Sequence, residues 1–269
     1  MEIKSKRVSW EFLNGKIPVT WKPVLKKILL SLPKMIYRHN LIILATLFGT
    51  DKWGGHWYAA HYQKYFSQWR HKKLNLLEIG VGGYGNPNLG GQSLRMWKTY
   101  FSKAKIYSID IYDKKLQENR IKIFQGNQDD PAFLKQVVGS MEGGVDIIID
   151  DGSHINSHII KSFEVLFPLL NDGGIYVVED VQTSYWPGFG GNSEDLTNSN
   201  TAMNYFKKIV DGLNYRELIR PGYVPTYFDQ SISAIHFLHS MIFIFKGDNT
   251  EESSILKNNS TSEKWVLGK

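Results

Sequence analysis

Short apolar runs alternate with longer amphipathic segments through the middle of the chain. Each short run has the length of one buried strand, and each longer segment has the length of a helix. Strands that alternate with helices in this way form a parallel sheet covered by helices on both faces. The predicted strands are residues 74–79, 105–109, 121–124, 145–149 and 175–178, and the predicted helices are residues 93–101, 131–138 and 158–170.

Two further apolar runs, residues 232–238 and 241–245, are separated only by His239 and Ser240. Two residues can join antiparallel neighbours, whereas a parallel pair needs a long crossover. We therefore expect an α/β fold with a Rossmann-like, doubly wound sheet that is mostly parallel and ends in a C-terminal antiparallel hairpin. Such an ending is unusual for a dinucleotide-binding sheet.

The segments that flank this region have a different composition. Residues 1–47 are rich in lysine and proline and read as a basic N-terminal extension, with a helix at residues 22–39 that Pro33 interrupts. We expect one α/β domain over residues 48–246 and a loose polar tail over residues 247–269. The longest apolar run is far below the roughly 20 residues of a membrane span, and early charges argue against a signal peptide.

Charge and cysteine content limit the possible functions. The 269 residues include no cysteine, which excludes disulfides, thiolate metal sites and a cysteine nucleophile. Residues 1–40 hold nine lysines and arginines against two acidic residues, so the other residues carry a net charge of −1. This neutral body argues against nucleic acid. The basic arm is either a solvated surface or a peripheral contact with an anionic membrane or polyanion, and we expect a cytoplasmic location that allows contact with the inner membrane face.

A glycine cluster follows the first predicted strand. Gly80, Gly82 and Gly85 fit the pattern G-x-G-x-x-G, which alone is a weak sign of nucleotide binding. Pro87 delays the next helix, so its N-terminus is not presented to a phosphate. Glu78 at the strand end would repel a phosphate, but its carboxylate can accept hydrogen bonds from an ammonium group.

Polar side chains at the next two strand ends suit the rest of such a ligand. Asp110 ends the second strand, where an acid can accept both ribose hydroxyls. Residues 125–129, which include Gln128, follow the third strand and can read an adenine edge. S-adenosylmethionine combines these groups without a phosphate. The alternative is that Glu78 and Asp110 are only solvated acids at strand ends.

Pairs of acidic residues follow the fourth and fifth strands. Carboxylates that converge at one sheet edge repel one another unless they share a cation. Hard oxygen ligands favour Mg²⁺, with Mn²⁺ or Ca²⁺ as alternatives, over Zn²⁺. We predict Asp151, Glu179 and Asp180 as the metal ligands. Asp150 either caps the next turn or accepts a hydrogen bond from the cofactor.

His154 lies three residues beyond Asp151 and is the predicted catalytic base. A histidine beside a divalent ion can remove a proton from a hydroxyl that the ion polarises. The resulting oxygen can attack the methyl group of a sulfonium. The alternative interpretation is an ordinary solvated loop that contains one histidine and adjacent acids.

Several motifs together carry a family resemblance: residues 49–53, 77–84, 90–97, 149–156, 179–180 and 185–191. They resemble class I S-adenosylmethionine-dependent methyltransferases, in particular the metal-dependent sugar O-methyltransferases of macrolide biosynthesis. The resemblance spans roughly residues 48–246 and implies the class I methyltransferase fold and a methyltransferase domain there. It also implies Asp151, Glu179 and Asp180 as Mg²⁺ ligands and His154 as the base. The predicted cofactor site consists of Glu78, Gly80, Gly82, Tyr84, Ser93, Asp110, Gln128 and Asp150.

The resemblance also suggests what the chain acts on. Members of this family methylate a deoxysugar hydroxyl and assemble as oligomers, so we expect a homo-oligomer and a sugar-containing acceptor. Residues 1–47 do not resemble the family's longer N-terminal domain, which helps to build the sugar pocket. The expected acceptor is therefore a glycan, a glycolipid or a glycosylated natural product. Aromatic residues within residues 183–200 can stack on a sugar ring.

Two other functions fit parts of the pattern. A nicotinamide-dependent oxidoreductase would use the loop from Gly80 to Gly85 for its dinucleotide. A non-catalytic module that binds glycans or membranes would use the basic arm instead.

Overall fold

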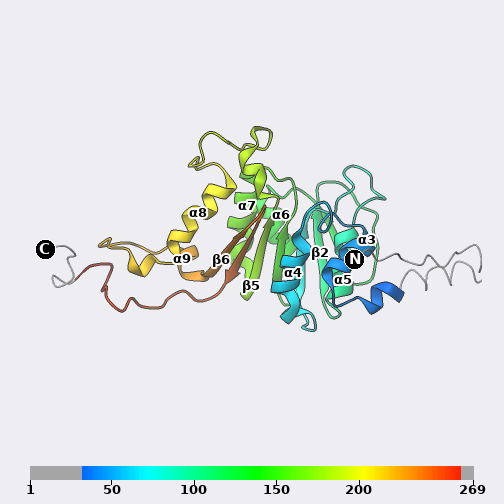
Figure 1. Ribbon diagram of the computed structural model, residues 1–269, viewed down its shortest axis with the longest axis horizontal. Coiled ribbons are helices and arrows are strands. Elements are labelled where there is room, and N and C mark those ends of the chain that lie inside the picture. The colour runs from blue at the N-terminus through cyan, green and yellow to red at the C-terminus, as the bar shows by residue number, and fades with distance from the viewer. Residues whose placement is uncertain (1–31, 262–269) are drawn as a thin grey trace, which may run out of the picture. The chain divides into compact units, whose positions relative to one another are not determined.

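The computed structural model describes residues 32–261 of the chain (Figure 1). Its contacts divide the chain into two compact units, Met1–Ser67 and Gln68–Lys269. The sequence predicted a boundary at residue 47 instead, but that position lies within a helix, α3 (Leu41–Phe48), which packs on α4 (Tyr58–Phe66) in the first unit. Of the helix predicted over residues 22–39, residues 32–36 are helical and residues 22–31 lie outside the described residues.

Helix α3 has clear signals at both ends. The side chain of Asn40 accepts a hydrogen bond from the backbone N–H of Ile43 at 3.0 Å, which satisfies a donor of the first turn. Gly49 ends the helix with a φ of 68°, a left-handed conformation that glycine adopts at little cost. The apolar run of residues 41–48 is thus a short capped helix, and none of the described helices combines the length and apolarity that crossing a membrane requires.

The second unit is built on one seven-stranded sheet with the order β3-β2-β1-β4-β5-β7-β6. Strands β1 to β5 are parallel, and β7 pairs antiparallel with both β5 and β6. The prediction of a mostly parallel sheet with a C-terminal antiparallel hairpin is confirmed. The strands are β1 (Asn75–Ile79), β2 (Lys105–Asp110), β3 (Ile121–Gln125), β4 (Val145–Asp150), β5 (Leu170–Glu179), β6 (Ile232–Leu238) and β7 (Met241–Lys246).

The strand order reverses between β1 and β4. Loops that leave neighbouring strands at such a point open a crevice at their carboxyl ends, where ligands bind in open α/β sheets. Ile79 pairs with Asp150, and Asp150 pairs with Val178. The loops after β1, β4 and β5 therefore start side by side.

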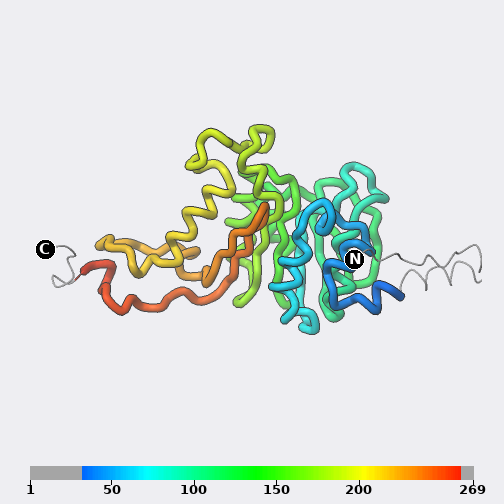
Figure 2. Tube along the Cα trace, viewed as in Figure 1, coloured from blue at the N-terminus to red at the C-terminus, as the bar shows by residue number. Residues whose placement is uncertain are grey.

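Helices cover both faces of this sheet. One face carries α6, α7 and α8, whose apolar residues pack with Leu77, Ile148 and Tyr176. The opposite face carries α5, which contacts Glu78. The trace in Figure 2 shows the yellow α8 and α9 region beside the orange hairpin, and α9 contacts β6 directly. The helices of this unit are α5 (Gln92–Tyr100), α6 (Pro131–Gly139), α7 (Asn156–Leu166), α8 (Ala202–Gly212) and α9 (Tyr227–Ser231).

Some boundaries differ from the predicted ones. The helix predicted over residues 158–170 starts earlier, and Pro168 ends it in a 3₁₀ turn. Strand β5 begins at Leu170, so the predicted helix-closing turn is part of the strand. Helix α8 was not predicted. The 3₁₀ turns are η2 (Ser67–Trp69), η3 (Phe167–Leu169), η4 (Val181–Tyr185), η5 (Pro187–Phe189) and η6 (Tyr215–Glu217).

The predicted loose tail is anchored over the part that the structure describes. Asn259 is buried, and its amide donates to the carbonyl oxygens of Tyr215 at 2.6 Å and Leu218 at 2.8 Å. Asn249 donates to the carbonyl oxygen of Asp229 at 2.7 Å. These side-chain hydrogen bonds to backbone carbonyls hold the described part of the segment against η6 and α9.

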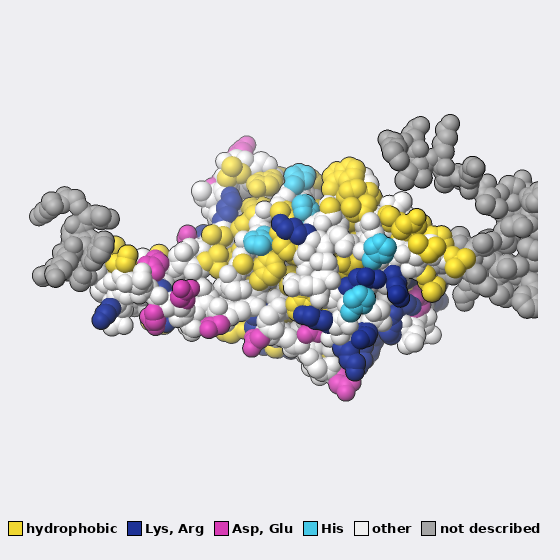
Figure 3. All heavy atoms as spheres, turned by 60° about the horizontal axis from the view of Figure 1, so that its bottom comes forward, with side chains coloured by type: hydrophobic (Ala, Val, Ile, Leu, Met, Phe, Trp, Pro, Cys, Tyr) yellow, Lys and Arg dark blue, Asp and Glu magenta, His cyan; other side chains and the backbone are white. Residues whose placement is uncertain are grey.

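Basic side chains gather in one area of the face shown in Figure 3. In the second unit, four consecutive basic residues, Arg70, His71, Lys72 and Lys73, precede β1, and the last three are exposed. This run lies at the amino edge of the sheet, opposite to the edge at which the predicted site residues lie.

Candidate active site

The acidic loops after β4 and β5 converge as predicted. One carboxylate oxygen each of Asp151 and Asp180 and one imidazole nitrogen of His154 lie within 4.8 Å of one another. The three side chains are between 14% and 25% exposed, so ligands can reach them. These three residues, which we call the acidic group, are the strongest candidate for an active site in the described residues.

Backbone strain accompanies this group. His154 has a φ of 57° and Asp180 a φ of 55°, both in the left-handed region. Such a conformation costs non-glycine residues on the order of 1–3 kcal/mol and persists where the surroundings impose it. It brings His154 Nε2 to 3.6 Å from Asp180 Oδ2 and 4.0 Å from Asp151 Oδ1. Gln182 also donates to the other oxygen of Asp180, at 3.1 Å.

Glu179 precedes Asp180 in the sequence, but its side chain is not part of the close group. Its side chain is buried at the end of β5. The close group of described residues consists of Asp151, His154 and Asp180, without Glu179. The assignment of Glu179 as a metal ligand stays a prediction.

Gly80 lets the first loop approach the acidic loop. The N–H of Asp151 donates to the carbonyl oxygen of Ile79 at 3.1 Å. A Cβ on Gly80 would lie 2.2 Å from the carbonyl oxygen of Asp151. A side chain at this position would push the two loops apart, so Gly80 has a packing role whatever it binds.

Asp150 and Gln128 use their polar atoms within the protein. Gln128 Nε2 donates to Asp150 Oδ1 at 3.2 Å, and Ser162 Oγ donates to Oδ2 at 2.8 Å. Burial raises the pKa of Asp150 to about 6, although these hydrogen bonds and the nearby His154 oppose the rise. Gln128 Oε1 accepts from the N–H of Ser153 at 2.7 Å, so the pair supports the loop that carries His154. That either residue contacts a cofactor stays a prediction.

The structure brings together two residues of the predicted cofactor site, Glu78 and Ser93. Ser93 Oγ donates to Glu78 Oε2 at 2.9 Å, and Trp97 Nε1 donates to the same oxygen at 3.1 Å. The carboxylate is fully buried between β1 and α5. Its orientation is therefore fixed by the fold.

Asp110 lies beside the loop between β1 and α5, which we call the glycine loop (residues 80–91). Its Oδ2 accepts from the N–H of Val81 at 3.0 Å, and its Oδ1 accepts from that of Tyr112 at 2.9 Å. Gly82 has a φ of 76° and open space around its Cα. Tyr84 is also left-handed, with a φ of 46°, and its side chain is 88% exposed. Exposed side chains on a backbone held this firmly can contact a ligand without rearrangement.

Comparison with known proteins identifies the relatives of this chain. It is 44% identical over 215 residues to the mycinamicin VI 2''-O-methyltransferase of Micromonospora griseorubida. The matched region covers 79% of this chain and 54% of that protein. It is 44% identical over 211 residues to the demethylmacrocin O-methyltransferase of Streptomyces fradiae, over 77% of the chain and 53% of that protein. The chain is a homologue of the macrolide sugar O-methyltransferases.

The solved structures agree with this homology. The MycE methyltransferase of the mycinamycin biosynthetic pathway, in complex with Mg and SAH, matches with a TM-score of 0.76 and 42% identity over 79% of this chain and 55% of that one. Over the matched residues, the chain thus has the same fold as MycE. No protein-family model matches the chain. The chain spans about half the length of these relatives.

Asn156 is a structural residue of the site that the sequence analysis did not single out. Its buried amide donates to the carbonyl oxygens of Thr183 at 3.2 Å and Phe189 at 2.9 Å. Its Oδ1 accepts from Ser184 Oγ at 2.9 Å and from the N–H of Ala202 at 2.7 Å. One side chain thus joins the starts of α7 and α8 to the loop over residues 183–200, which we call the aromatic loop. The sequence signals for it were its position at a helix start and its place at the end of the motif over residues 149–156.

The aromatic loop that follows Asp180 is ordered by these bonds. Trp186 is 48% exposed, and its ring centroid lies 5.9 Å from that of Phe189. A Cβ on Gly191 would lie 2.3 Å from the carbonyl oxygen of Thr183, so the loop folds back closely on itself. The loop therefore offers exposed aromatic surface on a fixed backbone.

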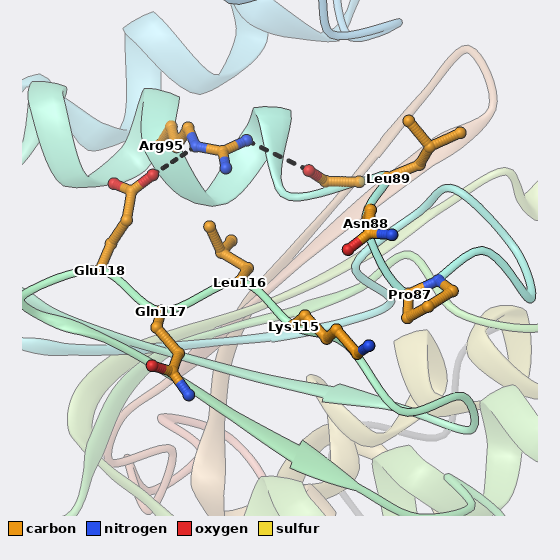
Figure 4. Close-up of a pocket in the computed structure, with 9 residues that line it drawn as sticks. Pro87, Asn88, Leu89, Arg95, Lys115, Leu116, Gln117 and Glu118 are labelled. Atoms are coloured by element: carbon orange, nitrogen blue, oxygen red, sulfur yellow. Dashed lines mark hydrogen bonds and ion pairs between the residues drawn. The ribbon is translucent and has the colours of Figure 1, made fainter.

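A separate cavity of about 300 Å³ lies between residues 87–90 and residues 115–118 (Figure 4). Arg95 contributes its guanidinium, but Glu118 holds it at 2.6 Å and the carbonyl oxygen of Gly90 at 3.2 Å. None of the predicted site residues lines this cavity. It is a less suitable reaction site than the group of Asp151, His154 and Asp180, because its guanidinium is already paired with Glu118. The lining residues are Pro87, Asn88, Leu89, Gly90, Arg95, Lys115, Leu116, Gln117 and Glu118.

Proposed function

We propose that the chain is a metal-dependent O-methyltransferase that moves a methyl group from S-adenosylmethionine to a sugar hydroxyl. The observation that carries the proposal is the close group of Asp151, His154 and Asp180 beside a glycine loop. The homologues support it, because their names describe O-methylation of glycosylated compounds. Since the chain covers about half of their length, the activity of the whole protein is part of the proposal.

The donor set fits a hard divalent cation. Asp151 and Asp180 offer carboxylate oxygens, which Mg²⁺ prefers, and the chain has no cysteine that would favour a softer metal. Adjacent carboxylates are also most stable when a cation offsets their repulsion. We propose that Asp151, Asp180 and the neighbouring Glu179 hold Mg²⁺. When bound, the ion would polarise the acceptor hydroxyl and lower its pKa.

The groups beside the glycine loop fit S-adenosylmethionine. Glu78 is a fixed carboxylate at the end of β1, suited to the ammonium group of the methionine part. Asp110 lies at the end of β2, where an acid can accept hydrogen bonds from ribose hydroxyls. The bound donor would supply an electrophilic methyl group on its sulfonium sulfur. We propose that Gly80, Gly82, Tyr84, Ser93, Gln128 and Asp150 complete or support this site.

We assign proton removal to His154. Its Nε2 would take the hydroxyl proton of the acceptor while the acceptor oxygen bonds to the methyl carbon and the bond from that carbon to sulfur breaks. After the transfer, Asp180 Oδ2, which lies 3.6 Å from the same nitrogen, would stabilise the protonated imidazole. The aromatic loop with Trp186 would cover the sugar and exclude water.

The acceptor we propose is a hydroxyl of a vicinal diol on a sugar that is attached to a larger molecule. The named homologues act on a mycinamicin and on a rhamnosyl tetracenomycin. MycE has also been solved with mycinamycin VI. Glycosylated natural products are therefore the first acceptors to test, followed by glycans and glycolipids. We also propose that the protein is a homo-oligomer; a membrane contact through residues 1–40 falls largely on residues outside those described.

Removal of the metal tests the proposal directly. Purified protein is incubated with labelled S-adenosylmethionine, Mg²⁺ and a panel of glycosylated acceptors, and methylated product is measured by mass spectrometry. Excess EDTA should abolish turnover, and added Mg²⁺ should restore it. Asp151→Asn should lose activity, whereas Asp172→Asn, an exposed acid at the start of β5, should not.

Binding measurements separate this function from the two alternatives. Calorimetry should detect S-adenosylhomocysteine and not NAD; tight binding of NAD alone would instead support the oxidoreductase. Full turnover in excess EDTA would refute the role of the metal. Binding to liposomes without any methyl transfer would favour the non-catalytic module.

A further inference from the structure

Lys114 follows β2 and is almost completely buried, with 8% of its surface exposed. Its Nζ donates to the carbonyl oxygens of Gly82 at 2.7 Å, of Tyr84, and of Asn86 at 3.4 Å. A lysine ammonium has three N–H donors and no acceptor. The three carbonyls of one loop therefore match the full donor capacity of this side chain.

The glycine loop needs such a partner. Gly82, Gly83 and Tyr84 follow one another with positive φ angles of 76°, 75° and 46°. For Tyr84 this conformation is unfavourable, and its 88% exposed side chain gains little from packing. Hydrogen bonds from a charged donor are stronger than neutral ones. The ammonium of Lys114 therefore stabilises a loop shape that the backbone would not adopt by itself.

The segment that carries Lys114 holds the glycine loop at two further points. Asp110 Oδ2 accepts a hydrogen bond from the N–H of Val81 at 3.0 Å. The N–H of Lys115 donates to the carbonyl oxygen of Pro87 at 2.9 Å, and Figure 4 shows these two residues beside each other. The segment from Asp110 to Lys115 is thus hydrogen-bonded to the loop after β1 at several points, and Lys114 makes the central contacts.

We propose that Lys114 is a positioning residue for the methyl donor: its ammonium holds the loop from Gly82 to Asn86 in the shape that binds S-adenosylmethionine. This inference rests on the proposed function, because Tyr84 and Asp110 belong to the proposed donor site. Lys114 acts through the loop, since its donors are occupied by backbone carbonyls. In the sequence it is one of two adjacent lysines, a pattern typical of a solvated surface.

The adjacent lysine provides a matched control. Lys115 lies in the same loop and carries the same charge, but its side chain is exposed and only its backbone N–H bonds to the glycine loop. Lys114→Met should raise the dissociation constant of S-adenosylhomocysteine, measured by calorimetry on the full chain, at least tenfold. Lys115→Met should change it less than twofold. Lys114→Arg should recover part of the affinity, because it keeps a charged donor.

A second ligand separates positioning from general loss of structure. The acidic group comes from the loops after β4 and β5, so Mn²⁺ affinity, measured without S-adenosylhomocysteine, should change less than twofold in Lys114→Met. A matching loss of Mn²⁺ affinity would mean that the variant is generally damaged and would overturn the specific role. If Lys114→Met does not fold, Lys114→Gln replaces it, with the same expectations.

The outcomes distinguish this inference from the function on which it rests. If the unaltered protein binds S-adenosylhomocysteine and the Lys114 variants bind it equally well, the positioning role is wrong and the methyltransferase function stands. If the unaltered protein does not bind S-adenosylhomocysteine, both are wrong.

Discussion

Several residues of the site adopt backbone conformations that only certain residue types tolerate well. His154 and Asp180 both adopt left-handed backbone angles, which aspartate and histidine tolerate better than most residues. Gly80 leaves room for the carbonyl oxygen of Asp151. The result is an imidazole close to two carboxylates, in a geometry that a generic loop would not hold.

Replacement of His154 tests the proposed base. His154→Asn keeps a residue type that tolerates the left-handed backbone but removes the basic nitrogen, so turnover should fall about 10²–10⁴-fold. The dissociation constant of S-adenosylhomocysteine should change less than twofold. His71→Ala, an exposed histidine at the opposite edge of the sheet, is the control and should keep full activity. A His154→Asn rate equal to that of the unaltered protein would refute the assignment.

Asp150 predicts a dependence of stability on pH. Burial raises its folded-state pKa to about 6, above its unfolded value near 4. Between these two values the folded state binds the proton more tightly, so the stability that this group contributes is lost as the pH rises. The free energy of unfolding is measured with urea, in EDTA, at about pH 4 and about pH 7. From the lower to the higher pH it should fall in the unaltered protein by roughly 3 kcal/mol more than it does in Asp150→Asn. Parallel pH profiles of the two proteins would contradict this.

Sequence reasoning found strand-end residues more readily than supporting ones. Asp110, Asp151 and Asp180 were predictable because parallel strands deliver their carboxyl ends to one edge. Lys114 and Asn156 were not, because most of their partners are backbone groups of other loops, and no residue pattern encodes such contacts. Distances between the acids also depend on backbone angles that the sequence does not specify.

Among the elements, the start of α7 supports two loops of the site. Asn156 connects this helix to η4, η5 and α8, so the loop that carries His154 and the aromatic loop share one support. Helix α8, which the sequence analysis missed, is part of this support. A signal for it was present: Thr201 caps the helix by accepting a hydrogen bond from the N–H of Asn204.

Loss of the Asn156 side chain should loosen the aromatic loop. Asn156→Ala leaves buried backbone groups without partners, so we expect a loss of at least about 2 kcal/mol in the free energy of unfolding by urea. Limited proteolysis should cut residues 183–200 faster than in the unaltered protein. Ser193→Ala, which removes an exposed hydrogen bond to the Tyr185 carbonyl, is the control. Equal proteolysis rates in Asn156→Ala and the control would show that the loop has other supports.

At the scale of the whole molecule, all candidate site residues lie in one compact unit, Gln68–Lys269. The directions of its strands were predictable, because the lengths of the connections between hydrophobic runs separate parallel from antiparallel neighbours. The division of the chain at Ser67 was not, because the packing of α3 on α4 depends on contacts between helices.

The confinement of the site to one unit predicts its binding stoichiometry. Each chain should bind one S-adenosylhomocysteine, and dilution to the monomer should leave the dissociation constant unchanged within about twofold, as expected for independent sites. Calorimetry combined with analytical ultracentrifugation measures both quantities. Loss of binding on dissociation would show that a neighbouring chain completes the donor site.

The antiparallel direction of β7 has a practical consequence. Because this strand starts at the edge of the acidic group and ends at the opposite edge, residues 247–261 begin far from the reaction. The chain has no cysteine of its own, so Glu251→Cys, at an exposed position, would create a unique thiol. A fluorophore attached there would report on rotation and assembly of the protein in solution while leaving the acidic group undisturbed.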